Sequence, residues 1–231
     1  PETGEIINKD RLDVGGLGKA RFILKPGGTL GDLYTQSGLK RDENGMVEID
    51  PNGNLVTVDN LPDIKLGSVF PKANLAWRNS FEWHGVQLSA LITARIGGVV
   101  YSATQAAMDQ YGVSETSARA RDNGGVLVNG RTMVNPQTWY TAIGSSSGLP
   151  QYYTFSATNV RLQEASIGYT VPRKWLGNVC SIHIALVGRN LLMIYNKAPF
   201  DPESVASTGN YYQGIDYFMM PTLRSMGFNI K

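Results

Sequence analysis

The residues that most often do chemistry in proteins are few in this chain and are scattered along it. His84 and His183 are the two histidines and lie in separate predicted elements, and Cys180 is the single cysteine. A metal site or an activated nucleophile needs several such groups close together. The serine-rich residues 145–148 lack the pattern of a nucleophile elbow. We therefore expect no catalytic site, no metal and no cofactor, and hence no enzyme.

Two acidic turns invite a calcium interpretation. Residues 42–45 read Asp-Glu-Asn-Gly, and residues 50–53 read Asp-Pro-Asn-Gly. The ligand spacing of the helix-loop-helix calcium motif is absent. Asp, Asn and Gly at these places are explained by turn formation alone, so we interpret both segments as turns.

Two other groups of residues could take part in binding. Charged residues in strands are expected to form a polar network rather than a catalytic site, and these are Arg78, Glu82 and Arg95. Aromatic residues in long connections could stack on sugars or pack on peptide side chains, and these are Trp139, Tyr140, Tyr152, Tyr153, Tyr211 and Tyr212. The alternative for the aromatic group is packing of loop against loop or against a partner protein.

The elements that must position these residues are mostly strands, because apolar residues recur at every second place. The even positions of residues 86–96 are all apolar, and Pro26-Gly27-Gly28 is a hairpin signal between two short apolar segments. Seven strands are expected, at residues 19–25, 29–35, 73–83, 86–96, 157–171, 178–190 and 221–231. Short helices are expected at 101–111 and 136–143, the second capped by Asn135 before Pro136.

The alternation slips in the strand 157–171. Val160 and Leu162 share one parity, whereas Ala165, Ile167 and Tyr169 share the other. One interpretation is a β-bulge near residues 163–164 that returns all five side chains to one face. The other is a regular strand that is longer than the bilayer is thick, with its start above the membrane and Arg161 turned outward among headgroup phosphates. We favour the regular strand.

Composition and loop lengths indicate where such strands would lie. Charged residues make up 17% of the chain, below the roughly 25% of ordinary soluble domains. The net charge of +2 and the absence of a basic run argue against a nucleic-acid partner. No run of about 18 apolar residues is present, so no transmembrane helix is expected. Connections alternate between very short and very long, which is typical of an outer-membrane β-barrel.

Three groups of residues resemble one family. The motifs are Leu-Gly-Ser-Val-Phe-Pro-Lys at 66–72 leading into Trp-Arg-Asn-Ser-Phe at 77–81, and Arg-Ile-Gly-Gly at 95–98. The third group is residues 160–172 followed by 188–191 and by Phe-Asp-Pro-Glu at 200–203. In order and spacing they are similar to the C-terminal part of a SusC/RagA-type TonB-dependent outer-membrane transporter.

The resemblance implies an all-β fold, an antiparallel transmembrane β-barrel of 22 strands closed by a plug. Residues 1–231 would supply roughly the last seven strands of the barrel domain, and the plug and N-terminal domains would lie outside the chain. Arg78, Glu82 and Arg95 would then face the lumen. The connections 97–156 and 191–220 would be extracellular, and 84–85 and 172–177 periplasmic. Trp83, Tyr169 and Trp175 would lie near the periplasmic interface.

The resemblance also implies function and partners. The chain would belong to an outer-membrane importer of oligosaccharides or oligopeptides, energised by the TonB complex through the plug region and covered by a SusD-like surface lipoprotein. Membrane lipid and lipopolysaccharide would contact its outer face. A soluble β-sandwich that binds glycans is the alternative from another class, and a siderophore receptor is the alternative among transporters.

Overall fold

The computed structural model describes residues 10–145, 148–206, 209 and 212–231. The chain divides into two compact units. The first unit comprises Pro1–Phe70, Val99–Phe155 and Val205–Met219, and the second comprises Pro71–Gly98, Ser156–Ser204 and Met220–Lys231. That both belong to one barrel region stays a prediction.

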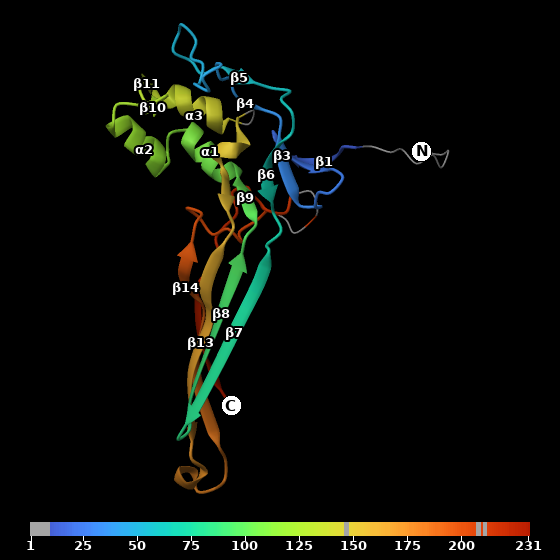
Figure 1. The fold of residues 1–231 in the computed structure, drawn as a ribbon. Coiled ribbons are helices and arrows are strands. Elements are labelled where there is room, and N and C mark those ends of the chain that lie inside the picture. Colours follow the sequence, from blue (N-terminus) through green and yellow to red (C-terminus); the bar gives the residue numbers. More distant parts are fainter. Residues whose placement is uncertain (1–9, 146–147, 207–208, 210–211) are drawn as a thin grey trace. The chain divides into compact units, whose positions relative to one another are not determined.

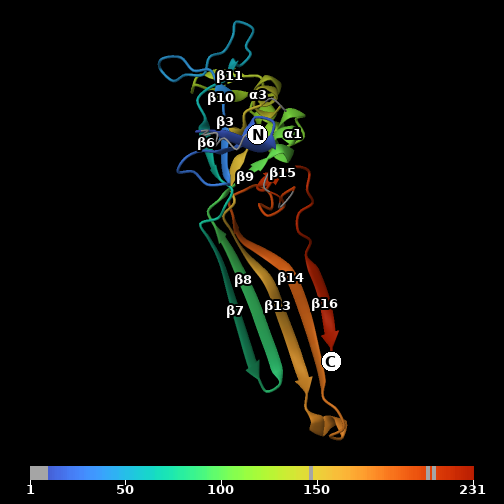
Figure 2. The same cartoon turned by 90° about the vertical axis from the view of Figure 1, so that its right-hand side faces the viewer.

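The second unit is built on a five-stranded antiparallel sheet (Figure 2). Its strands lie side by side in the order β16 (Ser225–Ile230), β14 (Ile182–Asn196), β13 (Asn159–Val171), β8 (Val86–Ile96) and β7 (Ala73–Trp83). Within the described residues β7 and β16 have no further neighbour, so the sheet is open at both edges. Closure into a barrel, and the number of strands in it, stay predictions.

Residues opposite each other in this sheet are alike in polarity. On the face called here the apolar face, one row across the five strands reads Trp83, Val86, Tyr169, Ile184 and Ile230, and the next reads Phe81, Leu88, Ile167, Leu186 and Phe228. Most of these large side chains are exposed. On the opposite face, called the polar face, Ser80, Ser89 and Ser166 lie in one row. The alternation read from the sequence thus becomes two faces of opposite character.

Tight turns join the strands at one end of the sheet, as predicted. His84 and Gly85 connect β7 to β8 with positive φ angles of 48° and 85°, the geometry that two-residue hairpins favour. The 3-10 helix η2 (Arg173–Leu176) and the left-handed Gly177 lie between β13 and β14. The long connections all leave the opposite end of the sheet (Figures 1 and 2).

The break of alternation in β13 is a β-bulge, so the favoured regular strand was wrong. Leu162 pairs with Ile92 and Glu164 with Leu91, which leaves Gln163 as an extra residue. The same interval is irregular on the other side, where Leu162 pairs with Leu192 and Glu164 with Arg189. Because one residue is left out of the alternation, Val160 and Leu162 return to the apolar face with Ile167.

The first unit holds short strands and three helices. Its largest sheet has the order β1 (Leu12–Leu17), β2 (Ala20–Leu24), β3 (Asp32–Thr35) and β6 (Ile64–Ser68). Smaller sheets combine β12 (Thr154–Ser156), β9 (Val99–Ser102) and β15 (Ile215–Asp216), or pair β4 (Gly38–Leu39) with β5 (Thr57–Val58) and β10 (Val126–Val128) with β11 (Thr132–Val134). The helices are α1 (Ala103–Gln110), α2 (Glu115–Asp122) and α3 (Pro136–Gly144), and η1 (Pro150–Tyr152) is a 3-10 turn.

Each helix begins at a side-chain cap. Ser102, Ser114 and Asn135 accept hydrogen bonds from the first-turn amides of α1, α2 and α3. At its far end α3 comes close to α1, because a Cβ added to Gly144 would lie 2.6 Å from the carbonyl oxygen of Ala106. The cap and Pro136 confirm the predicted helix at 136–143, whereas α2 was not predicted.

The buried apolar core lies in the first unit. Its largest fully buried side chains include Phe22, Ile23, Leu33, Leu149 and Ile215. In the second unit the buried apolar side chains among the described residues are small: Ala157, Ala185, Ala198 and Pro202. The two strands predicted at 19–25 and 29–35 form a hairpin, β2–β3, but this lies in the four-stranded sheet. The predicted seven-stranded count is therefore not confirmed, since five of those strands share one sheet.

The bulge makes a testable prediction. Deleting Gln163 leaves every other residue of β13 on its present face, so we expect a cost of about 1 kcal/mol, the usual size of a single change. Deleting Ser166 shifts the alternation of the residues before it by one, so Glu164 turns toward the apolar face whether or not the bulge is kept. Its charge then lacks polar partners, which we expect to cost about 2 kcal/mol or more. Folded yield and melting temperature of the full-length protein check this. Equal loss in both deletions would contradict it.

Candidate functional site

Charged residues from three strands meet on the polar face. Glu164 lies between two arginines, with Oε1 3.5 Å from Nη2 of Arg78 and Oε2 3.2 Å from Nε of Arg189. Glu82 and Arg95 lie on the same face, opposite Gln87 and Asn74 in register. The predicted polar network thus shares one face, but the partner of Arg78 is Glu164, which sequence reasoning did not select. Its luminal position stays a prediction.

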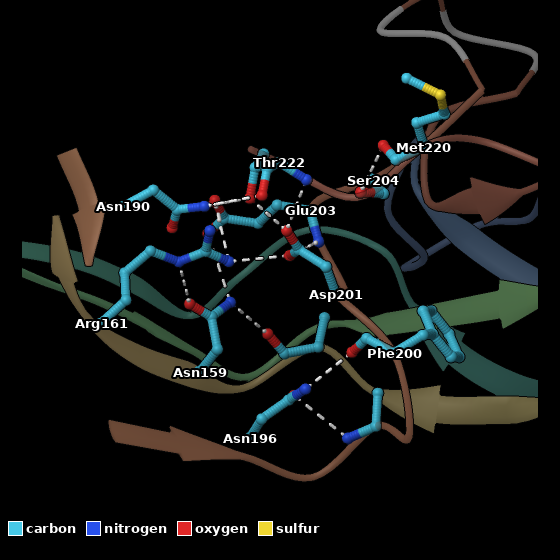
Figure 3. Close-up of polar contacts among 12 residues, drawn as sticks. Asn159, Arg161, Asn190, Asn196, Phe200, Asp201, Glu203, Ser204, Met220 and Thr222 are labelled. Carbon is cyan, nitrogen blue, oxygen red and sulfur yellow. Dashed lines mark hydrogen bonds and ion pairs between the residues drawn. The ribbon is translucent and has the colours of Figure 1, made fainter. Parts of the chain in front are cut away.

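A second polar cluster lies at the start of β13 and is centred on Arg161, whose side chain is only 2% exposed (Figure 3). Its Nε donates to Asn159 Oδ1 at 3.2 Å, and its Nη2 donates to Asp201 Oδ1 at 2.9 Å. Glu203 Oε2 lies 3.3 Å from the same Nη2. Asn159 also donates from Nδ2 to Glu203 Oε1 at 3.2 Å. We call these four residues the Arg161 cluster.

The Arg161 cluster also holds both ends of the connection between β14 and β16. Asp201 Oδ2 accepts a hydrogen bond from Thr222 Oγ1 at 2.6 Å, although the two residues lie at opposite ends of the loop. Asn190 of β14 donates from Nδ2 to the carbonyl oxygen of Thr222 at 2.9 Å and to its Oγ1 at 2.8 Å (Figure 3). Both ends of the loop are therefore fixed to the strands by one connected set of polar contacts.

The position of Arg161 corrects the prediction that it points outward among headgroup phosphates. The guanidinium is buried and faces two carboxylates, because the bulge puts it on the same face as Glu164. In the sequence, residues 200–203 stand out only as part of a family motif. A buried arginine needs carboxylates to offset its desolvation. The sequence contains them at Asp201 and Glu203, but no local pattern pairs residues forty positions apart.

The environment sets the charge of Asp201. Burial alone would raise the pKa of this carboxyl group, but hydrogen bonds from Thr222 and Arg161 outweigh it and hold the pKa below its ordinary value. The ionised form is therefore the one that the cluster stabilises. Asp201 lies outside the membrane-spanning strands of the predicted barrel, in the connection after β14.

The predicted aromatic residues do not meet in one place. The rings of Trp139 and Tyr152 contact edge to face, with centroids 5.9 Å apart at 81°. Tyr140 and Tyr153 are buried in the first unit, whereas Tyr212 is 47% exposed. Tyr211 lies outside the described residues. The first four thus take part in packing within the first unit, and substrate contact stays a prediction.

The remaining candidates show ordinary structural roles. Asp42 Oδ1 accepts from the amides of Asn44 and Met46, and Asp50 Oδ1 from those of Asn52 and Asn54, as turns require. Among the described residues no three His, Cys, Asp or Glu side chains gather in a way that could hold a metal ion. The same residues contain no helix that is long and apolar enough to span a membrane.

Removing the arginine at the centre of the cluster gives a second prediction. Arg161→Ala leaves Asp201 and Glu203 without their cation, so we expect a loss of about 3–5 kcal/mol, as for other buried ion pairs broken on one side. The control Arg189→Ala removes an exposed partner of Glu164 and should cost about 1 kcal/mol or less. Melting of the full-length protein measures both. Similar losses for the two variants would contradict a buried anchoring role.

A third prediction concerns pH. Because the folded state lowers the pKa of Asp201, its ionised form stabilises the loop at any pH above the unfolded value of about 3.9. This stabilisation is lost as the pH falls below that value toward the folded pKa. The protection of residues 197–224 against hydrogen exchange, relative to the intrinsic rate at each pH, should thus fall as the pH drops below about 3.9. In Asp201→Asn this part of the pH dependence should vanish; if it persists, another group causes it.

Comparisons with known proteins agree with the motifs. No family model matches the chain. The TonB-dependent receptor P3 of Formosa agariphila is 23% identical over 194 residues, which cover 80% of this chain and 18% of that protein.

Solved structures share the fold. The structure of the RagAB peptide importer in the closed-closed state aligns with 91% of this chain, and the aligned part makes up 25% of the importer chain. The TM-score is 0.57 and the sequence identity is 17%. A second structure, of the RagAB peptide transporter, aligns with 97% of this chain and 24% of the transporter chain, with a TM-score of 0.59 and 15% identity. The chain spans a quarter or less of the length of these proteins. They are a receptor and importers rather than enzymes, in line with the expected absence of catalysis. By sequence and by fold, the chain is similar to the C-terminal part of a SusC/RagA-type TonB-dependent outer-membrane transporter.

Proposed function

We propose that this chain forms part of the wall of an outer-membrane β-barrel that imports nutrients with energy from the TonB complex. The observation that carries the proposal is the five-stranded sheet with an exposed apolar face and an ion-paired polar face. Lipid-facing and lumen-facing residues alternate in this way in barrel strands. β7 and β8 have 11 residues each, a length that suits one crossing of the bilayer.

The alternative of a soluble glycan-binding sandwich explains the sheet less well. A sandwich buries one face of each sheet against a second sheet, whereas Trp77, Phe81, Leu186 and Phe228 are exposed. A contiguous apolar surface of this kind is costly in water and is normal in lipid.

For the substrate we propose oligopeptides, with oligosaccharides as the second class. Support comes from the solved structures of similar fold, which are described as a peptide importer. We further propose a SusD-like surface lipoprotein as a lid, with lipid and lipopolysaccharide around the barrel. Of the six predicted aromatic residues, Tyr212 has the most exposed ring among those described, so it is the first candidate for substrate contact.

Neighbouring positions on β7 provide the test. Trp77 and Ala76 are both exposed but lie on opposite faces. In lipid, Trp77→Arg should cost about 2–4 kcal/mol near the middle of the bilayer, whereas Ala76→Arg should be tolerated in the lumen. A deletion strain is complemented with each variant and grown on a casein peptide mixture, on mixed oligosaccharides, or on a ferric siderophore. The protein in the outer-membrane fraction is measured in parallel.

We expect Trp77→Arg to lower both membrane yield and growth on peptides, and Ala76→Arg to preserve both. A full-length protein that stays in aqueous solution without detergent would refute the barrel. Growth defects limited to oligosaccharides would move the proposal to that substrate class, and defects limited to the siderophore would replace it by iron uptake.

A further inference from the structure

A hollow of about 580 Å³ lies among the three helices of the first unit. Its wall is formed by the C-terminal end of α1, one side of α2 and the start of α3, which lie together in Figure 1. The volume falls within the range of small-molecule sites, roughly 300–1,000 Å³. The hollow is therefore large enough for a small ligand but not for a folded partner.

Two opposite charges line this hollow. Asp109, near the end of α1, is only 5% exposed, and its Oδ1 accepts a hydrogen bond from Gln105 Nε2 at 2.9 Å. Arg121, near the end of α2, lies against Gly112, since a Cβ added there would be 2.9 Å from Nη1 of the arginine. Within the part of the chain that the structure describes, neither side chain forms an ion pair. The two charges share a cavity without neutralising each other.

The negative charge of Asp109 acts on its neighbours. Burial raises the pKa of the Tyr140 hydroxyl, and the Asp109 carboxylate raises it further. Burial and then the charge of Asp109 are also the two largest causes that raise the pKa of Tyr153. A buried carboxylate with only neutral donors nearby is costly unless a cation joins it, so this end of the hollow favours an ammonium group.

The other end favours a carboxylate. Arg121 offers a planar set of N–H donors, which match the two oxygens of a carboxylate. Asn135 uses its Oδ1 to cap α3 by accepting from Gln137 N at 2.8 Å, so its amide nitrogen is the group left to donate. Tyr140 adds an aromatic side to the wall.

We propose that this hollow binds a small zwitterion, a molecule with an ammonium and a carboxylate group such as a free amino acid or a short peptide. Asp109 binds the ammonium and Arg121 binds the carboxylate. A neutral sugar could use the amide and tyrosine groups but would leave both charges unpaired. The inference concerns binding by the protein itself and holds whether or not the import function is correct.

The test uses calorimetric titration of the full-length protein in detergent with L-alanyl-L-alanine. Asp109→Asn and Arg121→Gln should each weaken binding by about tenfold to a hundredfold, the range for hydrogen bonds to charged groups. Arg119→Gln is the matched control, because Arg119 lies on the same helix and pairs with Glu115. It should leave the dissociation constant unchanged.

Modified ligands separate direct contact from misfolding. The C-terminal amide of the dipeptide should bind weakly and should no longer respond to Arg121→Gln, and the N-acetyl dipeptide should no longer respond to Asp109→Asn. Arg121 is exposed, so its variant should keep the wild-type melting temperature. Equal binding of all three ligands, unchanged binding in both variants, or saturable binding of maltose in place of the dipeptide would each overturn the proposal.

Discussion

A strand has only two faces. In the sheet of the second unit, one face of each strand is mainly apolar and the other mainly polar. β13 meets this constraint by leaving Gln163 out of the alternation. Arg161 and Glu164 are three residues apart and would face opposite ways in a regular strand, yet the bulge puts both on the polar face. Each then finds opposite charges: Glu164 pairs with arginines on β7 and β14, and Arg161 pairs with carboxylates in the connection between β14 and β16. The course of the loop thus follows from one extra residue.

The two units are stabilised by different means. The first unit buries phenylalanine, leucine and isoleucine side chains, as a water-soluble fold does. In the second unit the largest fully buried side chain is Arg161, and its large apolar residues are exposed. Hydrophobic burial within the chain therefore contributes little to this sheet. Its order depends on hydrogen-bonded pairing and polar anchoring and, in the proposed barrel, on an apolar surrounding.

Local patterns predicted part of the fold from the sequence. The even apolar positions of residues 86–96, the His84-Gly85 turn and the Asn135 cap each specify structure through neighbours in the chain. What failed depends on distant partners. Nothing local tells whether β2–β3 joins the five-stranded sheet, and the helix α2 has few apolar residues to reveal its period. The bulge was foreseen but not favoured, since its support comes from Ile92 and Leu91 on another strand.

The hydrogen bond between Asp201 and Thr222 closes the loop at its base. Once the base is fixed, the free energy of closing the segment above it grows only slowly with length, by about 0.6 kcal/mol for each doubling. Insertions, deletions and sequence changes between these two residues are thus largely uncoupled from the five-stranded sheet, although Ile215 and Asp216 in this segment also pair with β9 of the first unit. In the proposed barrel, this closed base would let the loop diversify what it presents to the outside while the sheet that carries it stays the same.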